Sequence, residues 1–219
     1  MDRFGYMKLI DKNAYERNKE AVHNENKYVF NCMNTDKICI FTDTGKMHTI
    51  KAVDIPLGRF RDKGTPVDNL SNYDSSQERM LYVAPVGQLR SDRLLFVTKT
   101  SMCKLVEGAE FDVAKRTIAS TKLADEDELI FIGSASEMEQ IVLQSHGGCF
   151  LRFLAQEVST MKKTALGVRG MKLADDDYLE HAYLLAGHQE YTISYHDKEY
   201  ALNKVRLAKR DTKGIKPRI

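Results

Sequence analysis

Short apolar runs, separated by tight polar or glycine turns, follow one another along the whole chain. Each run is about five residues long and is followed, after the turn, by a second run, so each pair predicts a β-hairpin. Helical patterns of 10–15 residues, which alternating α/β units need, do not occur, so the pattern predicts an all-β chain. The hairpin segments, of which the first is incomplete, are Phe4–Ile10, Ile38–Ile50, Leu94–Val106, Ile141–Phe153 and Tyr191–Leu202.

The turn residues of these hairpins recur at a regular spacing. They are Gly5, Gly45, Ser101, Gly148 and Asp197, which are 40, 56, 47 and 49 residues apart. Glycine and aspartate suit a turn position with positive φ. A period of 40–56 residues built from short strands is typical of blades arranged around an axis.

Two further kinds of segment complete each predicted blade. Short apolar segments at 14–15, 53–55, 111–113, 157–158 and 205–207 are interpreted as turns that lead the chain outward from the hairpin. The remaining strands are predicted at Tyr28–Phe30, Leu81–Val83, Leu129–Ile132 and His181–Leu185. We therefore expect one domain, a β-pinwheel of about five four-stranded blades, with approximate bounds 1–37, 38–93, 94–140, 141–190 and 191–219. Met1 falls inside a blade, which suggests a fragment whose first strand belongs to a longer chain.

An acidic motif is repeated at an offset of 50 residues. Six of eight positions agree between Lys122–Leu129 and Lys172–Leu179. Its carboxylates, Asp125–Asp127 and Asp175–Asp177, are of the type that can bind a metal ion. Both copies follow Lys-Leu-Ala and precede a predicted strand, so we interpret them as acidic turns and predict no metal.

Composition narrows the class of protein. Of the 219 residues, 42% are hydrophobic and 29% are charged, as in ordinary soluble domains. No apolar run approaches the roughly 20 residues of a membrane span, and no leader pattern opens the chain, so we expect a cytoplasmic protein that does not bind membranes. The four cysteines show no Cys-x-x-Cys spacing and are interpreted as packing residues, with a zinc site as the minor alternative.

Charge is unevenly distributed along the chain. The net charge is only +2, but residues 198–219 carry eight Lys/Arg against two acidic residues, and the rest of the chain is at −4. Such a polarised protein can bind a polyanion with one face. A solvated basic tail is the alternative that charge alone leaves open.

The basic residues recur in two places in the predicted repeat. DNA is a line of negative charge, so a protein that binds along it needs cations along a path rather than in a pocket. Contacts of this kind to the DNA backbone do not read the base sequence. One group lies early in the second hairpin strands: Lys8, His48, Lys104 and Arg152. The other lies in the outward linkers: Arg59, Arg61, Lys63, Lys115, Arg116, Lys162, Lys163, Arg169, Lys209, Arg210 and Lys213.

The motifs of common enzymes do not occur in the sequence. There is no phosphate-binding Gly-x-x-x-x-Gly-Lys-Ser/Thr loop, no Gly-x-Ser-x-Gly elbow and no recognisable histidine dyad. The aromatic residues lie mostly at strand positions, where core packing is favoured over base stacking. We therefore predict a chain without catalytic residues or cofactor.

Two segments carry a resemblance to a known family. Residues 163–173, between the Gly148 hairpin and the second acidic motif, and residues 41–64 resemble blades of the C-terminal domains of the A subunits of DNA gyrase and topoisomerase IV, which are bacterial type IIA topoisomerases. The resemblance implies a β-pinwheel whose blades exchange strands and whose basic rim binds and bends double-stranded DNA. It also implies that the DNA-cleaving tyrosine lies in a preceding domain of an ATP-dependent enzyme. The partners would then be the rest of the A subunit together with an ATPase B subunit.

One motif of gyrases is missing from the sequence. Gyrases carry the box Gln-Arg-Arg-Gly-Gly-Lys-Gly in the first blade, and the matching region 17–27 lacks it. The missing box favours a topoisomerase IV-like subunit or a divergent gyrase over a gyrase of the usual kind. Two other classes stay open: a protein-interaction propeller, which the absence of tryptophan disfavours, and a five-bladed carbohydrate-active enzyme, which needs converging carboxylates.

Overall fold

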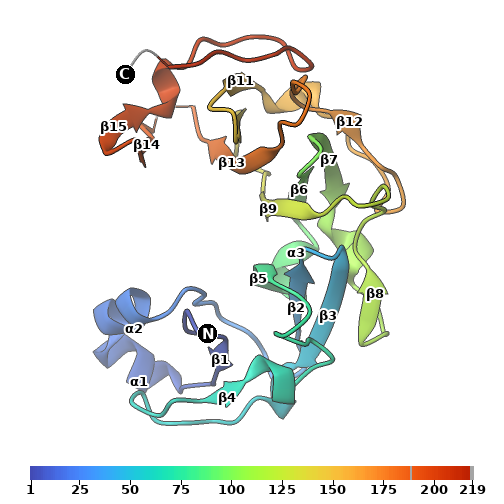
Figure 1. Ribbon diagram of the computed structural model, residues 1–219. Helices are drawn as coiled ribbons and strands as arrows, with labels where there is room; N and C mark the ends of the chain where they lie inside the picture. Colours follow the sequence, from blue (N-terminus) through green and yellow to red (C-terminus); the bar gives the residue numbers. More distant parts are fainter. Residues whose placement is uncertain (188, 218–219) are drawn as a thin grey trace.

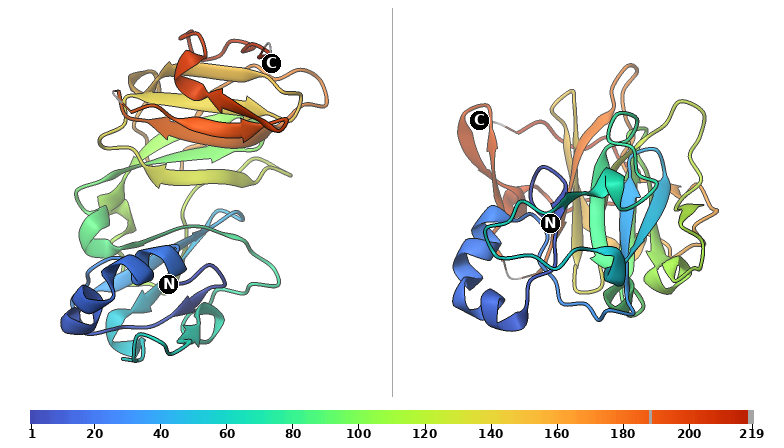
Figure 2. Two further views of the ribbon diagram at one scale, coloured as in Figure 1. Left: turned by 90° about the vertical axis from the view of Figure 1, so that its left-hand side faces the viewer. Right: turned by 90° about the horizontal axis from the view of Figure 1, so that it is seen from below.

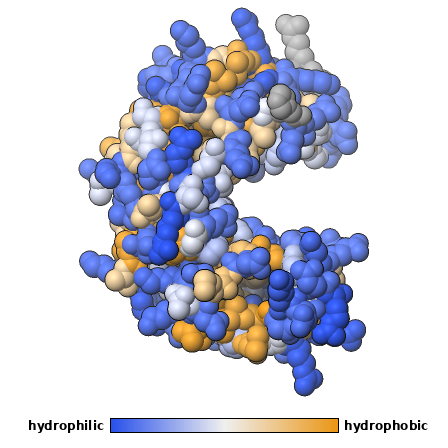
Figure 3. Space-filling model, turned by 180° about the vertical axis from the view of Figure 1, so that it is seen from behind, coloured by the Kyte–Doolittle hydropathy of each residue, from blue (hydrophilic) through white to orange (hydrophobic). Residues whose placement is uncertain are grey.

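The computed structural model describes residues 1–187 and 189–217, which form five small β-sheets placed one after another along an arc (Figure 1). The sheets stack along the arc, and the first and last lie at its two ends (Figure 2). The space-filling view has the same open outline, with a notch between the two end sheets (Figure 3). This arrangement confirms the prediction of an all-β, propeller-like pinwheel.

Each sheet is built around a hairpin, as the apolar pattern predicts. The complete hairpins are β2–β3 (Lys37–Thr42 and Lys46–Lys51), β6–β7 (Arg93–Thr98 and Met102–Glu107), β10–β11 (Gln140–Ser145 and Phe150–Leu154) and β14–β15 (Thr192–Tyr195 and Lys198–Ala201). The incomplete first one contributes β1 (Tyr6–Met7). All five predicted turn residues have positive φ: 84° at Gly5, 75° at Gly45, 72° at Ser101, 79° at Gly148 and 59° at Asp197.

The third strand of a sheet pairs with the first strand of its hairpin on the inner side of the arc. These inner strands are β5 (Met80–Pro85), β9 (Leu129–Ser134) and β13 (Leu179–Leu185). They confirm three of the four predicted remaining strands. The fourth prediction, Tyr28–Phe30, is wrong as a strand, because only Tyr28 pairs, through hydrogen bonds with Met1.

The outer strand of each sheet comes from the linker of the next sheet along the chain. The outer strands β4 (Thr65–Pro66), β8 (Thr117–Ala119) and β12 (Val168–Arg169) pair with β1, β3 and β7 respectively. A single antiparallel bridge, Phe150 to Ile215, repeats the arrangement at the end of the chain. The blades therefore exchange strands, and every linker is tied to its neighbour.

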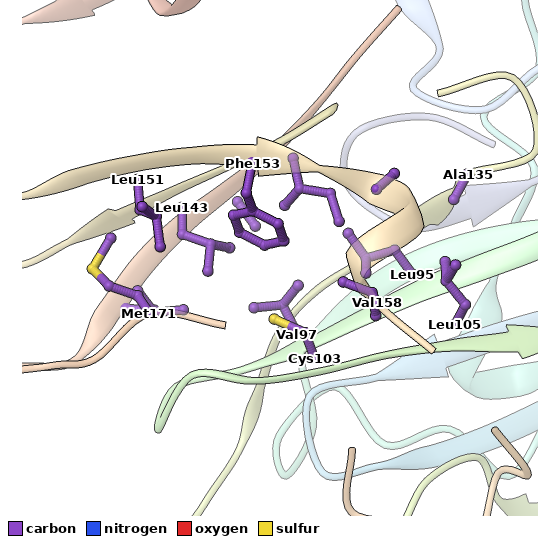
Figure 4. Packing of buried hydrophobic residues seen from close by; sticks show 14 residues of the cluster. Leu95, Val97, Cys103, Leu105, Ala135, Leu143, Leu151, Phe153, Val158 and Met171 are labelled. Carbon is purple, nitrogen blue, oxygen red and sulfur yellow. The ribbon is translucent and has the colours of Figure 1, made fainter. Parts of the chain in front are cut away.

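Apolar side chains between neighbouring sheets form four separate cores rather than one. Figure 4 shows the largest, where Phe153 and Leu143 of one sheet face Val97 and Cys103 of the previous one. Cys39 and Cys103 are buried and free, and burial raises the pKa of both thiols to about 12. The interpretation of these two cysteines as packing residues agrees with this placement.

The strand count and the linkers differ in part from expectation. Two sheets have four strands, one has three and two have two, so the four-stranded description holds for two blades only. Residues 17–27 and the predicted turn at 14–15 fall mainly within two short helices, α1 (Lys12–Arg17) and α2 (Lys19–Glu25). A further short helix, α3 (Val86–Leu89), follows β5. Single 3-10 turns also occur: η1 (Ala52–Asp54), η2 (Val67–Asn69), η3 (Gly108–Phe111), η4 (Ala155–Glu157) and η5 (Leu202–Lys204). Of these, η1, η3 and η4 overlap a predicted outward turn, and η5 directly precedes one.

Candidate nucleic-acid interface

Four linkers lie on the outer side of the arc, and we call them the rim loops (Figure 1). Each begins at a buried apolar anchor directly after a 3-10 turn, or at its last residue, and ends where an exchanged outer strand begins. The anchors are Ile55, Phe111, Val158 and Val205, and the loops are residues 55–64, 111–117, 158–167 and 205–214.

Three of the rim loops have the same construction. Two residues after the anchor, Leu57, Thr160 and Leu207 form parallel bridges with the preceding hairpin segments, at Leu9, Leu105 and Arg152 respectively. Four residues after the anchor a turn begins, and it is closed by hydrogen bonds from Asp62 N to Arg59 O (3.1 Å), Ala165 N to Lys162 O (2.9 Å) and Thr212 Oγ1 to Lys209 O (2.9 Å). The turn therefore starts on an exposed cation in all three loops.

The second rim loop is three residues shorter, yet it keeps this cation. Counting from Phe111, the fourth residue is Lys115, which is exposed. Arg59, Lys115, Lys162 and Lys209 thus occupy one equivalent position in four successive linkers, and we call them the turn cations. Because each linker packs on the sheet before it, the loops that carry the turn cations follow one another along the outer edge of the arc (Figure 1).

Further predicted cations are exposed on the same loops and on the strands that follow them. They are Arg61, Lys63, Arg116, Arg169 and Lys213. Lys63 lies 4.2 Å from the centre of the Tyr6 ring. Arg116 Nη2 lies 3.9 Å from Asp54 Oδ2. Arg169 donates to both carboxylate oxygens of Asp211, at 2.5 and 3.1 Å, and these bonds raise the pKa of the Arg169 guanidinium.

One acidic residue lies beside a turn cation. Glu110 is 3.5 Å from Lys162, whose side chain is 82% exposed. Exposed ion pairs of this kind contribute at most about 1 kcal/mol, so a phosphate can displace the carboxylate at little cost. Lys163, by contrast, is half-buried and donates to the main-chain carbonyl of Glu110, so it serves the loop more than the surface.

The cations expected early in the second hairpin strands are not on the rim surface, which corrects that part of the prediction. Lys104 is 1% exposed and its ammonium donates to the carbonyls of Lys163 and Ala165, at 2.7 and 2.6 Å. Lys8 does the same to the carbonyls of Phe60 and Asp62. These lysines hold rim loops from beneath, because carbonyls at the same two loop positions point inward in both modules.

His48 stands at the position of Lys8 and Lys104 in another module and is also buried, at 2% exposed. Its imidazole contacts the Thr117 hydroxyl at 3.1 Å and the Glu78 carboxylate at 3.1 and 3.2 Å. Burial alone would raise the pKa of Glu78, but hydrogen bonds from Thr42, His48 and Thr44 outweigh it and lower that pKa. His48 is therefore placed for packing and not for a phosphate.

Two arginines are likewise turned to the protein. Arg152 is half-buried and donates to the carbonyls of Asn203 and Val205 and to the side chain of Gln140. Arg210 is half-buried and donates to the carbonyls of Glu157 and Arg169. A guanidinium has five N–H donors, and these bonds occupy three of them on Arg152 and two on Arg210, so both groups are engaged in part by the protein.

The repeated acidic motif caps hairpin turns. Asp127 accepts hydrogen bonds from the amide and the hydroxyl of Thr100, at 3.0 and 2.6 Å. Asp177 accepts from the amide of Gly147 at 2.8 Å. These bonds explain the motif without a metal, and the described part of the chain contains no group of three potential ligands.

A cavity with a volume of about 400 Å³ lies between α2 and the first sheet, where Met7, Val22 and Phe30 contribute to its lining. In residues 1–187 and 189–217, no helix is long and apolar enough to cross a membrane.

The fold and the rim together define the class: an all-β pinwheel with exchanged strands and a basic outer edge. The family profile described as "DNA gyrase C-terminal domain, beta-propeller" matches residues 36–75, 92–136 and 139–186, which together are more than half of the chain. The chain therefore belongs to the DNA gyrase C-terminal domain family.

Individual relatives agree with this family. The chain is 25% identical over 231 residues to the DNA gyrase A protein of Ureaplasma parvum, an alignment that covers 98% of this chain and 27% of the relative. It is 31% identical over 144 residues to that of Salmonella typhimurium, covering 65% and 16%. The chain thus spans about a quarter or less of the length of these relatives.

Solved structures show the same fold. The C-terminal domain of a DNA topoisomerase IV superimposes with a TM-score of 0.80 at 23% identity, covering 97% of this chain and 69% of the other. The C-terminal domain of Escherichia coli ParC gives 0.76 at 15% identity, with 100% and 92% covered.

Proposed function

We propose that this chain is a non-catalytic module that binds duplex DNA without sequence preference and bends it along the rim. The observation that carries the proposal is the equivalent placement of the turn cations, Arg59, Lys115, Lys162 and Lys209, in four successive rim loops. A curved line of exposed cations can neutralise phosphates one after another, and such contacts position DNA without reading bases.

Bending follows from the shape of the rim. The rim loops that carry the turn cations lie on the convex side of an arc, so a straight duplex can contact only some of these loops at once. Bending a short duplex costs on the order of a few kcal/mol, which additional phosphate contacts can offset. The construction therefore favours a bent DNA over a straight one.

We further propose that the module is one domain of five repeats, near the bounds predicted from the sequence. It would belong to the A subunit of an ATP-dependent type IIA topoisomerase in the bacterial cytoplasm. Its partners would be the rest of the A subunit together with an ATPase B subunit. The α1–α2 segment, in place of a gyrase box, favours topoisomerase IV-like activity. A comparison of decatenation with DNA supercoiling by the whole enzyme tests this choice.

Binding of plain duplex DNA across a salt series tests the central proposal. Four phosphate contacts predict a log–log slope of about −3.6, and the neighbouring exposed cations make it steeper. A flat response would favour the alternative of a protein-interaction scaffold. A strong preference for one short sequence would contradict backbone binding.

A further inference from the structure

The residue directly before the anchor is acidic in three of the four rim-loop linkers. Asp54, Glu110 and Glu157 precede the anchors of the first three rim loops, and we call them the pre-anchor carboxylates. In the fourth linker the same position holds Lys204, at the end of η5. Because η5 forms with a lysine there, the 3-10 turn itself does not require a carboxylate. The contacts of the acidic side chains therefore have to explain them.

Two pre-anchor carboxylates bind the next rim loop in the same way, at the residue that follows its turn cation. Lys163 N donates to Glu110 Oε2 at 3.2 Å, and Arg210 N donates to Glu157 Oε2 at 3.0 Å. The side chains of Lys163 and Arg210 donate in turn to the main-chain carbonyls of Glu110 and Glu157, both at 3.1 Å. Each carboxylate thus bridges its own linker to the following one.

The first pre-anchor carboxylate has a looser contact at the equivalent place. Asp54 is exposed, and its Oδ2 lies 3.9 Å from Nη2 of Arg116, which directly follows the turn cation Lys115. A carboxylate therefore lies at each of the three junctions between successive rim loops. A main-chain N–H can donate to an amide oxygen as well as to a carboxylate, so the hydrogen bonds at Glu110 and Glu157 do not require a negative charge.

The charge of Glu110 lies where a phosphate would bind. Its side chain is only 16% exposed, and its Oε1 lies 3.5 Å from the ammonium of Lys162. A phosphate that binds Lys162 in this place lies at most about 6 Å from the carboxylate, well within the Debye length of about 10 Å at 0.1 M salt. A phosphate that draws Lys162 away leaves Glu110 without its cation. Both routes cost affinity, and the small cost at one carboxylate is repeated along the rim.

We infer that the pre-anchor carboxylates lower the affinity of the rim for DNA, so that bound DNA dissociates more readily than from the turn cations alone. The inference rests on the proposed DNA binding and names the residues that limit its strength. Each carboxylate bridges two rim loops and also opposes a phosphate on the neighbouring turn cation. Removing the charge while keeping the hydrogen-bond acceptor should therefore tighten binding, whereas a purely structural role predicts no gain.

The test measures binding of a labelled plain duplex by fluorescence anisotropy, for the wild-type chain and for D54N/E110Q. Repulsion between two charges about 6 Å apart in water corresponds to about a threefold change in Kd. We therefore expect D54N/E110Q to bind about tenfold more tightly than the wild type at low salt, with slower dissociation. The gain should shrink as the salt concentration rises.

The matched control is D125N/E137Q, which removes the same two kinds of charge. Asp125 and Glu137 are exposed and flank the inner strand β9, away from the rim loops. We expect the control to stay within about twofold of the wild-type Kd, because its charges lie outside the proposed path of the DNA.

The outcomes separate this inference from the function on which it rests. If D54N/E110Q binds no more tightly than the wild type, or if the control gains as much, the inference is overturned and DNA binding stands. If the folded wild-type chain binds no duplex, the proposed function itself fails, and the inference with it. Circular dichroism checks the fold of each variant, and D54N alone, at an exposed position, repeats the test with an expected gain of about threefold.

Discussion

Lys104 donates a 2.6 Å hydrogen bond from its buried ammonium to the main-chain carbonyl of Ala165, which lies 61 residues later in the third rim loop. At the N-terminal end of the arc, the ammonium of Lys8 donates in the same way to the main-chain carbonyl of Asp62. The hairpin of one sheet therefore fixes the loop of the following sheet. The turn cations are positioned by the protein itself before any DNA is bound, so little ordering remains to be done on binding.

Lys104 predicts a specific pH dependence of stability. Burial lowers the pKa of its ammonium to about 8, from about 10.5 in the unfolded chain. The folded state therefore bears a penalty at neutral pH that is relieved as pH rises from about 8 to about 10.5. Relative to Lys104→Met, the wild type should gain on the order of 1–3 kcal/mol over this range.

Urea unfolding of both proteins at pH 7, 8.5 and 10 measures this gain. Taking the difference between the two proteins removes the contribution of other titrating groups, such as Tyr82, whose pKa burial raises to about 12. A difference in unfolding free energy that stays constant with pH would show that the ammonium is not desolvated as described.

In three of the four rim loops, a glycine with positive φ precedes the exchanged segment. Gly167 has φ of 107°, and a Cβ there would lie 2.7 Å from the carbonyl oxygen of Cys103. We expect Gly167→Ala to cost about 2 kcal/mol or more in unfolding free energy, because neither the backbone angle nor the main-chain contact can adjust cheaply. Differential scanning calorimetry measures the loss.

The matched control for this glycine is Gly87 in α3, where nothing lies within 4 Å of an added Cβ. Gly87→Ala should be neutral or stabilise by about 0.5 kcal/mol, since alanine favours helix. Equal effects of the two substitutions would refute the account of strand exchange.

The acidic motif predicts a contrast between neighbouring aspartates. Asp177 caps Gly147, so Asp177→Ala should destabilise the fold by about 1–2 kcal/mol at pH 7. Asp175 is exposed, and Asp175→Ala should have almost no effect. Thermal unfolding with and without a chelator completes the test, because a metal site would make the melting temperature fall when the chelator is added.

The loss at Asp177 should shrink in acid. Burial would raise the pKa of this carboxyl, but the amide of Gly147 and other donors outweigh it and lower the pKa below its usual range. The stabilisation from the Asp177 cap is therefore complete at pH values above the pKa that Asp177 has in the unfolded chain, near 4. It is lost as the pH falls through the lower pKa that Asp177 has in the folded protein. A difference between wild type and Asp177→Ala that persists at pH 2 would contradict the cap.

The hairpins and their turns could be predicted from the sequence because they depend on local chemistry. Apolar runs around Gly45 and Gly148 leave few choices other than a tight turn with positive φ, and both residues adopt it. The inner strands at Leu81–Val83 and Leu129–Ile132 were predictable for the same reason. The segment at Tyr28–Phe30 has the same apolar character, but only Tyr28 finds a backbone partner, so pattern alone could not decide its state.

The cations could be predicted as a group but not individually. Charge marks Lys104 and Lys162 alike, yet one is buried beneath a rim loop and the other is 82% exposed on it. The difference depends on backbone carbonyls about 60 residues away, which no local pattern reveals. Alignment of the linkers on their anchors, Val158 and Val205 among them, does separate the turn cations, and this spacing is readable in the sequence once the anchors are known.

The chain alone should perform no topoisomerase reaction. Its sequence contains no nucleotide-binding loop of the Gly-x-x-x-x-Gly-Lys-Ser/Thr type and no Gly-x-Ser-x-Gly elbow. We expect purified protein to leave supercoiled plasmid unrelaxed and uncut with ATP and magnesium, as judged by agarose gel. Relaxation that co-purifies with the chain through two unrelated columns would disprove this expectation.

The salt dependence of duplex binding by a rim variant tests the central claim most directly. The rim variant Lys162→Glu/Lys209→Glu reverses the charge of two turn cations. The control variant Lys19→Glu/Arg93→Glu reverses the charge of two exposed cations on α2 and β6, so both variants have the same net charge. The rim account predicts that the first variant binds more weakly and that its log–log slope is shallower by about two, with the fold unchanged, whereas the control keeps the wild-type slope. If the control loses as much affinity and slope as the rim variant, DNA binding is diffuse and the rim is not the interface.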